Sequence, residues 1–278
     1  MKRIIAIINR NRVESIGLLG AAIVIFIAIF GPWLAPYSPT ELDMDNKYLP
    51  PSAKHLFGTD SAGRDIFSRV LAGTHISLTV VGWVILAALT VGGLIGISAG
   101  FIGGMYDNVI MRLADIFLSF PPLILAMAIA AALGSGLNSA IVALAVTWWP
   151  GYARVIRSQV LSTKSEVYVE SAEAIGAPKR RIIFQHILLN SIDPIIVQVT
   201  LDEGYVILAV AGLGFIGVGA QPPTPEWGSM VAAGRNQIIC NWWVSILPGL
   251  VLFMTVLSFN LLGDLLRREM DPQLWKKK

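Results

Sequence analysis

The chain has 278 residues, of which 55% are hydrophobic and only 14% are charged, and its mean hydropathy is +0.67. Because a soluble domain carries about 25% charged residues, this composition predicts an integral membrane protein. The single cysteine, Cys240, excludes an internal disulfide framework. The net charge of +3 is small and no nucleic-acid motif is present, so we expect no nucleic-acid partner.

The first predicted element is a membrane span over residues 15–35. An apolar run of about 20 residues is long enough to cross a bilayer. A signal peptide can begin in the same way, but no small-residue cleavage site follows. We therefore expect the span to be retained, with the N-terminus inside. Basic residues precede it at four positions: Lys2, Arg3, Arg10 and Arg12.

Residues 36–76 are polar and rich in proline, which predicts an extracytoplasmic loop that ends in a short amphipathic helix over residues 61–73. Residues 1–76 thus form a first region, and residues 77–278 form the membrane core. The potential metal ligands of the loop are His55, Asp60, Asp65 and His75. They are scattered over 21 positions without the spacing of a metal site, so we expect structural roles and no bound metal.

The second and third predicted spans cover residues 77–104 and 109–133. Glycines recur along the second, and small residues permit close helix packing in a membrane. In the third, the pair Pro121-Pro122 must interrupt the helical hydrogen bonds and predicts a kink. Arg112 and Asp115 lie three residues apart near its start and predict a local ion pair.

The fourth predicted span covers residues 137–160. Its Pro150-Gly151 step predicts an irregular helix. Arg154 and Arg157 lie about one turn apart near its inner end, where long basic side chains extend towards the membrane interface.

The fifth and sixth predicted spans, residues 193–219 and 243–266, enclose an irregular external segment rich in glycine and proline. Asp202 and Glu203 are the unusual feature of the fifth span. Asp202 would lie about 13 Å along the helix, where carboxylates are costly and indicate function. We interpret the pair as part of a translocation path that could bind the ammonium of a peptide or a cationic solute, with Gln198 and Thr200 as companions. A packed pair satisfied by another subunit, or two protonated acids, would be structural alternatives.

Between the fourth and fifth spans lies a polar stretch, residues 166–190. Its first part predicts a short amphipathic helix. Three glutamates would share one face and three other side chains a second face: Glu166, Glu170 and Glu173, and Tyr168, Ala172 and Ile175. Gly176 suits the C′ position of this helix, and Pro178 prevents its continuation. A basic run, residues 179–181, then opens a second apolar helix.

This stretch resembles the EAA loop of bacterial ABC-transporter permeases, through Glu170-Ser171-Ala172, three further residues and Gly176. In that family the loop is a coupling helix that docks in a groove of the cytoplasmic ATPase, and the resemblance gives these four residues that role. Ser171 stands where alanine is usual, and Leu189 replaces a frequent proline. Two further segments, LFGTDSAGRDIFSRVLAGTHISL and AGLGFIGVGAQPPTPEWGSMVAAGR, resemble the peptide/nickel branch of these permeases.

The distribution of basic residues predicts the same orientation. With the N-terminus inside, inner segments hold 16 of the 21 Lys and Arg residues and outer segments hold 5. This bias follows the positive-inside rule, which places both termini and the coupling loop in the cytoplasm.

The resemblance implies an all-α integral membrane protein with six transmembrane helices and the type I ABC importer permease fold, in a bacterial or archaeal plasma membrane. It further implies a second homologous permease, two ATPase subunits and an extracytoplasmic solute-binding protein. Because the chain has no P-loop or HExxH motif, we expect no enzyme activity and no bound cofactor, with ATP bound by the partner subunits. Di- or oligopeptides are the first expected substrate, nickel or a nickel chelate is the second, and glutathione or an antimicrobial peptide is the third. A proton-coupled secondary transporter that uses Asp202 and Glu203 as a relay is the alternative from another class.

Overall fold

The computed structural model describes residues 12–190 and 192–270. They form an all-α fold, as predicted; between them the structure contains no strand, only an isolated bridge between Thr59 and Asp65. The long helices are α2 (Arg12–Leu34), α3 (Ile66–Ile102), α4 (Gly104–Leu118), α5 (Pro122–Leu133), α6 (Leu137–Lys164), α10 (Ile192–Ile216) and α12 (Trp243–Met270). The shorter elements are η1 (Met44–Asn46), α7 (Val167–Ala174), α8 (Lys179–Arg181), a π-helical turn η2 (Ile182–Ile187), α9 (Leu188–Asn190), α11 (Trp227–Gly234) and η3 (Arg235–Gln237).

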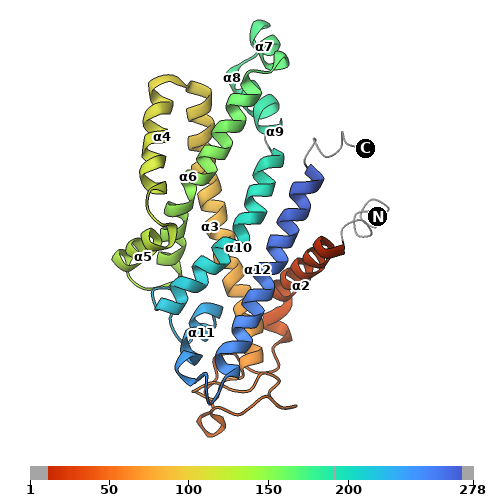
Figure 1. Ribbon diagram of the computed structural model, residues 1–278, viewed down its shortest axis with the longest axis vertical. Helices are drawn as coiled ribbons and strands as arrows, with labels where there is room; N and C mark the ends of the chain where they lie inside the picture. Colours follow the sequence, from red (N-terminus) through yellow and green to blue (C-terminus); the bar gives the residue numbers. More distant parts are fainter. Residues whose placement is uncertain (1–11, 191, 271–278) are drawn as a thin grey trace.

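Most of the long helices run up and down along the long axis of the molecule, whereas α5 lies across it (Figure 1). One end carries α7 and α8, together with the turn that joins α3 to α4. The opposite end carries α11 and the loop between α2 and α3 (Figure 1). This alternation of turns between the two ends is the one that the sequence predicted.

Four described helices are long and apolar enough to cross a membrane: α2, α3, α10 and α12. The pair α4 and α5 gives a fifth candidate, but the two helices meet at an angle of 88°. The kink predicted at Pro121-Pro122 is therefore a break in the helix. The remaining predicted span corresponds to α6, which has 28 residues. It is long enough to cross, but its Trp-Trp-Pro-Gly-Tyr sequence and its arginines lower its hydropathy.

Two local predictions were wrong, those for residues 61–73 and for the external segment. The short helix expected over residues 61–73 is the beginning of α3, which continues for 37 residues because nothing near residue 76 breaks a helix. The helix α6 continues through Pro150, so the irregularity predicted at Pro150-Gly151 does not interrupt it. The external segment is less irregular than expected, because Glu226 begins α11 by accepting hydrogen bonds from the backbone N–H groups of Gly228 and Ser229. Burial raises the pKa of Glu226, and these hydrogen bonds partly oppose that rise.

The close packing predicted from the glycines is confirmed between α3 and α6. A β-carbon at Gly96 would lie 2.6 Å from the carbonyl oxygen of Ala153, and one at Gly92 would collide with the carbonyl oxygen of Trp149. Only a residue without a side chain allows the two backbones to approach this closely.

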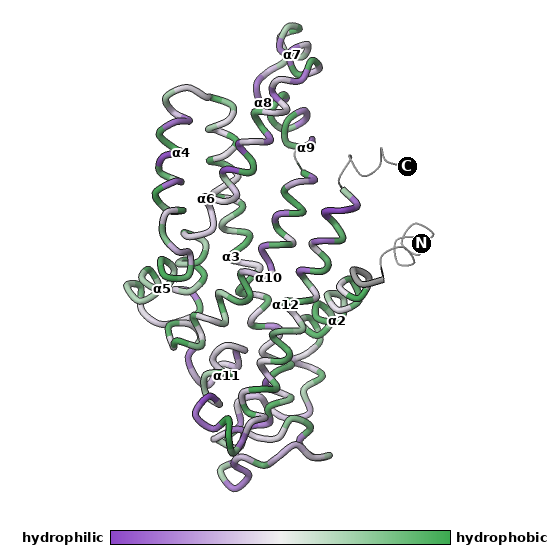
Figure 2. The backbone as a smooth tube through the Cα atoms, in the orientation of Figure 1, coloured by the Kyte–Doolittle hydropathy of each residue, from purple (hydrophilic) through white to green (hydrophobic). Residues whose placement is uncertain are grey.

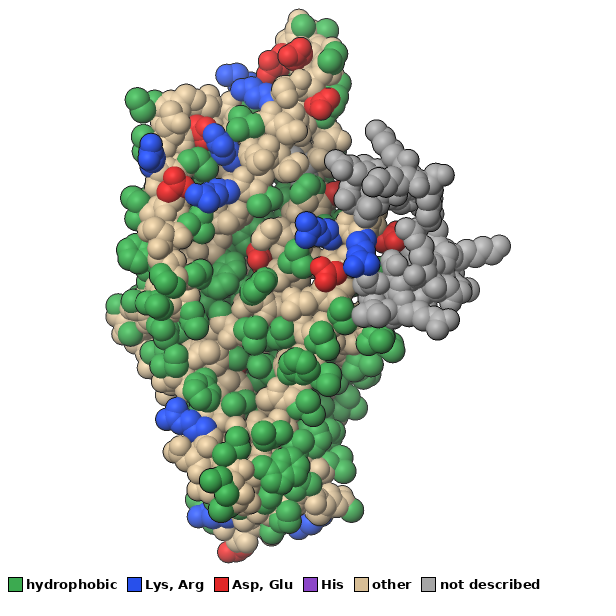
Figure 3. Space-filling model, viewed as in Figure 1, with side chains coloured by type: hydrophobic (Ala, Val, Ile, Leu, Met, Phe, Trp, Pro, Cys, Tyr) green, Lys and Arg blue, Asp and Glu red, His purple; other side chains and the backbone are tan. Residues whose placement is uncertain are grey.

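Hydrophobic residues dominate the middle of the long helices, and hydrophilic residues gather around α7, α8 and the opposite loops (Figure 2). The space-filling view shows a broad band of hydrophobic side chains between two regions that carry charged ones (Figure 3). A chain that crosses a bilayer presents such a band to lipid or to neighbouring helices.

Candidate functional site

The first candidate site is α7 and the turn that ends it. Gly176 has a φ of +80°, and its N–H donates to the carbonyl of Glu173 at 2.9 Å. The next N–H, that of Ala177, donates to the carbonyl of Ala172 at 3.0 Å. These two bonds form a Schellman motif, in which the left-handed residue is usually glycine. The predicted end of this helix is confirmed.

The predicted apolar face of α7 is only partly correct. Of its three predicted residues, Ala172 is buried, whereas Tyr168 is 43% and Ile175 is 85% exposed. Val169, which was not predicted for this face, is buried instead. The side chain of Tyr168 accepts a hydrogen bond from the Asn190 amide at 3.0 Å, which ties α7 to α9. Glu170 and Ser171 are exposed, and the Ser171 hydroxyl donates to the carbonyl of Val167.

The four residues predicted for coupling therefore lie on one short helix and its cap, but they do not share one surface. Ala172 faces inward, and Glu170, Ser171 and Gly176 are exposed. The outer face consists of Val167, Ser171 and Ile175, which are spaced at i, i+4 and i+8. This face combines two exposed apolar side chains with one small polar side chain.

Charged groups fasten α6, which leads into α7, to its neighbours. Arg157 forms two hydrogen bonds with the buried Asp107 of α4, one of them from Nε to Oδ1 at 2.7 Å. Arg154 pairs with Asp115, so the local pair predicted between Arg112 and Asp115 is not formed. Both arginines hold α4 instead of extending freely to the interface. Lys164 donates to the carbonyl of Phe101, at the end of α3, at 2.9 Å.

The second candidate site is a cavity of about 460 Å³ between the break at α4–α5 and the helices α6 and α10. Most of its wall is apolar, including Leu118, Leu123 and Leu208. Trp148 and Tyr205 add aromatic rings, and Thr147, Gln198 and Asp202 add polar groups.

The structure separates the two acidic residues of α10. Asp202 lines the cavity, whereas Glu203 is not among the lining residues. Neighbouring residues of a helix point about 100° apart, so the two carboxyls leave α10 in different directions. Of the two predicted companions, Gln198 lines the cavity and donates from Nε2 to both carboxyl oxygens of Asp202 at 3.1 Å. Thr200 instead donates to backbone carbonyls of its own helix.

Sequence reasoning missed the contribution of α6 to this site. Tyr152 is only 1% exposed, and its hydroxyl lies beside the Asp202 carboxyl without a hydrogen-bond partner of proper geometry. Trp148, Gly151 and Tyr152 lie at i, i+3 and i+4, so they share one side of α6. This spacing was the available signal, but it does not show which neighbour the side faces.

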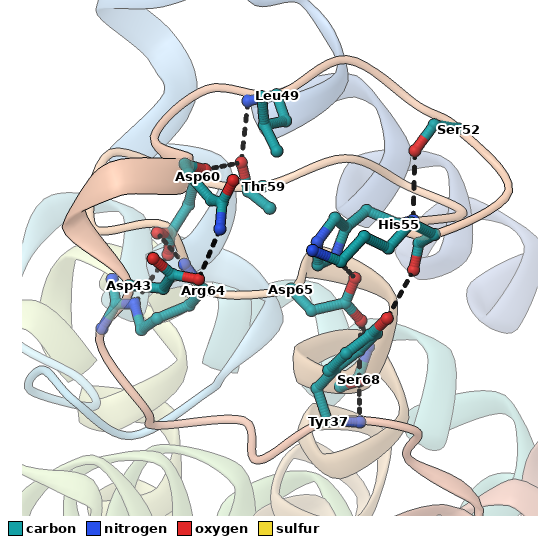
Figure 4. Close-up of polar contacts among 12 residues, drawn as sticks. Tyr37, Asp43, Leu49, Ser52, His55, Thr59, Asp60, Arg64, Asp65 and Ser68 are labelled. Carbon is teal, nitrogen blue, oxygen red and sulfur yellow. Dashed lines mark hydrogen bonds and ion pairs between the residues drawn. The ribbon is translucent and has the colours of Figure 1, made fainter.

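The polar residues at the opposite end form a structural network (Figure 4). His55 Nδ1 lies 3.0 Å from Asp65 Oδ1, and Asp65 Oδ2 accepts from the backbone and side chain of Ser68 at the start of α3. Asp60 pairs with Arg64 at 2.7 Å. Nη1 of Arg69 donates to the carbonyls of Pro39 and Pro223, which ties the loop to the segment before α11.

The remaining predicted loop residue, His75, lies within hydrogen-bond distance of the carbonyl of Ala28 in α2, at 2.8 Å. Within residues 12–190 and 192–270, no three His, Cys, Asp or Glu side chains converge as a metal site would require.

Residues 96–100, GISAG, match the pattern G-x-S-x-G of serine hydrolases. In those enzymes the serine lies on a sharp turn between a strand and a helix. Here Ser98 lies inside α3, and its hydroxyl is bonded to the carbonyl of Ile95 and within 3.1 Å of the Tyr106 hydroxyl. The geometry therefore gives this match no nucleophilic role.

Comparison with known proteins identifies the family. Residues 92–276 match the family of binding-protein-dependent transport system inner membrane components, and residues 2–51 match the N-terminal TM domain of oligopeptide transport permease C. The chain belongs to this family of ABC-transporter permeases.

Several curated relatives resemble almost the whole chain. A probable D,D-dipeptide transport system permease protein of Escherichia coli strain K12 is 46% identical over 251 residues, which cover 90% of this chain and 84% of the relative. A dipeptide transport system permease protein of Alkalihalophilus pseudofirmus is 43% identical, with coverages of 96% and 88%. A glutathione transport system permease protein of E. coli O6:K15:H31 is 42% identical, also with coverages of 96% and 88%.

Among solved structures, a chain of the inward-facing MetNI methionine ABC transporter superposes with a TM-score of 0.46 at 22% identity. The match covers 68% of this chain and 94% of the other.

Proposed function

We propose that the chain is a permease subunit of an ATP-driven importer of di- or oligopeptides. The observation that carries this proposal is the family match over residues 92–276 together with an exposed, Schellman-capped helix α7 at one end. The relatives described above are named for dipeptides and glutathione, which supports peptides ahead of nickel chelates.

In this proposal α7 is the coupling helix, and its outer face of Val167, Ser171 and Ile175 contacts a cytoplasmic ATPase subunit. Only two residues, Ser165 and Glu166, separate α6 from α7. Because α6 is fastened to α4 by Arg154 and Arg157, a displacement of α7 would move α4 and α6 together. Both helices line the cavity, so ATP-driven movement at α7 would change the shape of the cavity.

The end that carries α7 is the cytoplasmic end in this proposal. Lys164 and the run Lys179–Arg181 lie at or beside α7, in agreement with the positive-inside rule. Both termini would then be cytoplasmic, and the loop between α2 and α3, with α11, would face the solute-binding protein. A second permease would complete the transmembrane part. The terminal basic residues that enter the charge count, at positions 2, 3, 10 and 276–278, lie outside the described residues.

The test is purification of the tagged chain from its native host in a mild detergent, followed by reconstitution with its binding protein into liposomes. Mass spectrometry should identify a second permease and an ATPase. Uptake of a radiolabelled dipeptide should require ATP inside the liposomes, and a variant ATPase that cannot hydrolyse ATP is the control. Uptake driven by a proton gradient in preparations without an ATPase would instead establish a secondary transporter.

A further inference from the structure

We propose that the cavity beside Asp202 binds the positively charged amino group of the transported peptide. This inference rests on the proposed peptide-importer function and adds a recognition site within the membrane part. Three features of the cavity support it: the partners of Asp202, the aromatic rings in the wall, and the absence of basic residues from the described part of that wall.

The Asp202 carboxyl has too few partners for a charge at its depth. It lies ten residues into α10, which is about 15 Å along the helix. In the part of the chain that the structure describes, the ion pairs of aspartates involve Asp60, Asp65, Asp107 and Asp115, and none involves Asp202. Its two hydrogen bonds both come from the neutral amide of Gln198. A carboxylate in a membrane interior is stabilised by a cation, and the amide supplies no charge.

Tyr152 of α6 does not change this charge balance. Its hydroxyl lies beside the Asp202 carboxyl, but the side chain is only 1% exposed and is not among the residues that line the cavity. A phenol is neutral, so it supplies no charge to the carboxyl. An ammonium group entering from the cavity carries three N–H donors and a positive charge, enough to bind both oxygens of Asp202.

The walls also suit a peptide amino group. Trp148 and Tyr205 line the cavity, and aromatic faces attract cations. A volume of about 460 Å³ is within the range of small-molecule sites and leaves room for short side chains against the apolar wall. Among the described residues that line the cavity, none is Lys, Arg or His. A peptide carboxylate would therefore have no partner in this wall and would be repelled by Asp202, so the amino end is the end that the site recognises.

The test combines a change in the protein with a change in the substrate. The whole importer is reconstituted in liposomes with ATP inside, and its binding protein delivers either alanyl-alanine or N-acetyl-alanyl-alanine. Uptake is normalised to the loaded fraction of the binding protein, which is measured separately for each peptide. The variants are Asp202→Asn, Asp202→Glu and, as the matched control, Glu203→Gln, which removes the neighbouring carboxyl outside the cavity.

Loss of a charged hydrogen-bond partner should lower the uptake of alanyl-alanine by Asp202→Asn about 10- to 100-fold. Uptake of the acetylated peptide should be low already and change by less than about 3-fold, because the amino group that Asp202 recognises is absent. Asp202→Glu should recover most of the uptake of alanyl-alanine, and Glu203→Gln should resemble the wild type. Stimulation of ATP hydrolysis by the loaded binding protein should persist in Asp202→Asn, which shows that the complex is assembled.

Equal losses for the two peptides, or the same loss in Glu203→Gln, would overturn the assignment and make the carboxyl structural. Unchanged uptake in Asp202→Asn would also overturn it. If the wild-type complex transports neither peptide with ATP, the proposed function itself fails, so the two failures are distinguishable.

Discussion

Substitution of Gly176 tests whether the shape of α7 matters for transport. The residue has a φ of +80°, and a β-carbon built there would have no atom within 4 Å. A side chain would therefore cause no collision, and the cost would come from the backbone alone. That cost is about 1–2 kcal/mol for a residue with a β-carbon in the left-handed region, and it is smaller for asparagine. Both Gly176→Val and Gly176→Asn replace the glycine, but only valine strongly disfavours the left-handed backbone conformation. Comparing the two variants therefore isolates the effect of the backbone conformation on transport.

The consequence should be large because α7 has only eight residues and an isolated helix of that length is marginal. A cost of about 1–2 kcal/mol changes the population of the capped helix by about 5- to 30-fold. We expect Gly176→Val to lower ATP-driven uptake by about this factor, while Gly176→Asn stays within about 3-fold of the wild type. Uptake is measured in liposomes at matched amounts of inserted permease.

Gly176→Asp extends the same series. Its backbone cost should resemble that of asparagine, but it adds a negative charge to a tip that already exposes Glu170 and Glu173. We expect it to abolish transport without preventing membrane insertion, because the charge would lie at the surface that docks on the ATPase. Equal uptake by the valine, asparagine and aspartate variants would refute the reasoning.

Three further pairs of substitutions test the packing of the fold, each by thermal or denaturant unfolding in detergent. Gly92→Ala should lower the free energy of unfolding by about 1–3 kcal/mol, because the added β-carbon meets the backbone of α6. Gly82→Ala is the control: its β-carbon would have no atom within 4 Å, so this variant should be neutral or slightly stabilising. Equal effects of the two substitutions would contradict the close α3–α6 packing. Asp107→Asn should lower the free energy of unfolding by about 1–3 kcal/mol, because it leaves Arg157 without its paired charge. Asp115→Asn changes a half-exposed pair and should lower it by less than about 1 kcal/mol. The reverse order would show that the α4–α6 pairs are misassigned. Glu226→Ala should lower the free energy of unfolding by about 2 kcal/mol or more, because two backbone N–H groups lose their acceptor. Glu226→Gln keeps one side-chain oxygen and should lower it by less. An unaltered stability of Glu226→Ala would mean that α11 does not depend on this cap.

The features that could be predicted from the sequence depend on local chemistry. The end of α7 follows from Gly176 and Pro178, because a left-handed cap and a missing N–H act within a few residues. The break before α5 follows from adjacent prolines in the same way. The close approach of another helix to α3 could be predicted from its glycines at helical spacing. That this helix is α6 could not be predicted from them.

The features that could not be predicted depend on residues far apart in the chain. Asp115 has Arg112 three residues away, yet it pairs with Arg154, which lies 39 residues later on a helix packed beside it. The cavity wall likewise joins Trp148 to Asp202 only because α6 and α10 pack together. The exposure of Ile175 depends on where the body of the protein lies beside α7, which helical periodicity alone does not specify.

The central claim, that α7 contacts the ATPase, is tested most directly by cross-linking from a single cysteine. Cys240 is the only cysteine of the chain, so Cys240→Ser gives a background into which Ser171→Cys places one thiol on the exposed face of α7. Ser52→Cys is the matched control, because Ser52 is exposed in the loop at the opposite end. In a transport-active complex treated with a short bifunctional thiol–amine reagent, the account predicts a product between the cysteine at position 171 and the ATPase, and none from position 52. An ATPase product from position 52, or its absence from position 171 in an active complex, would contradict the account.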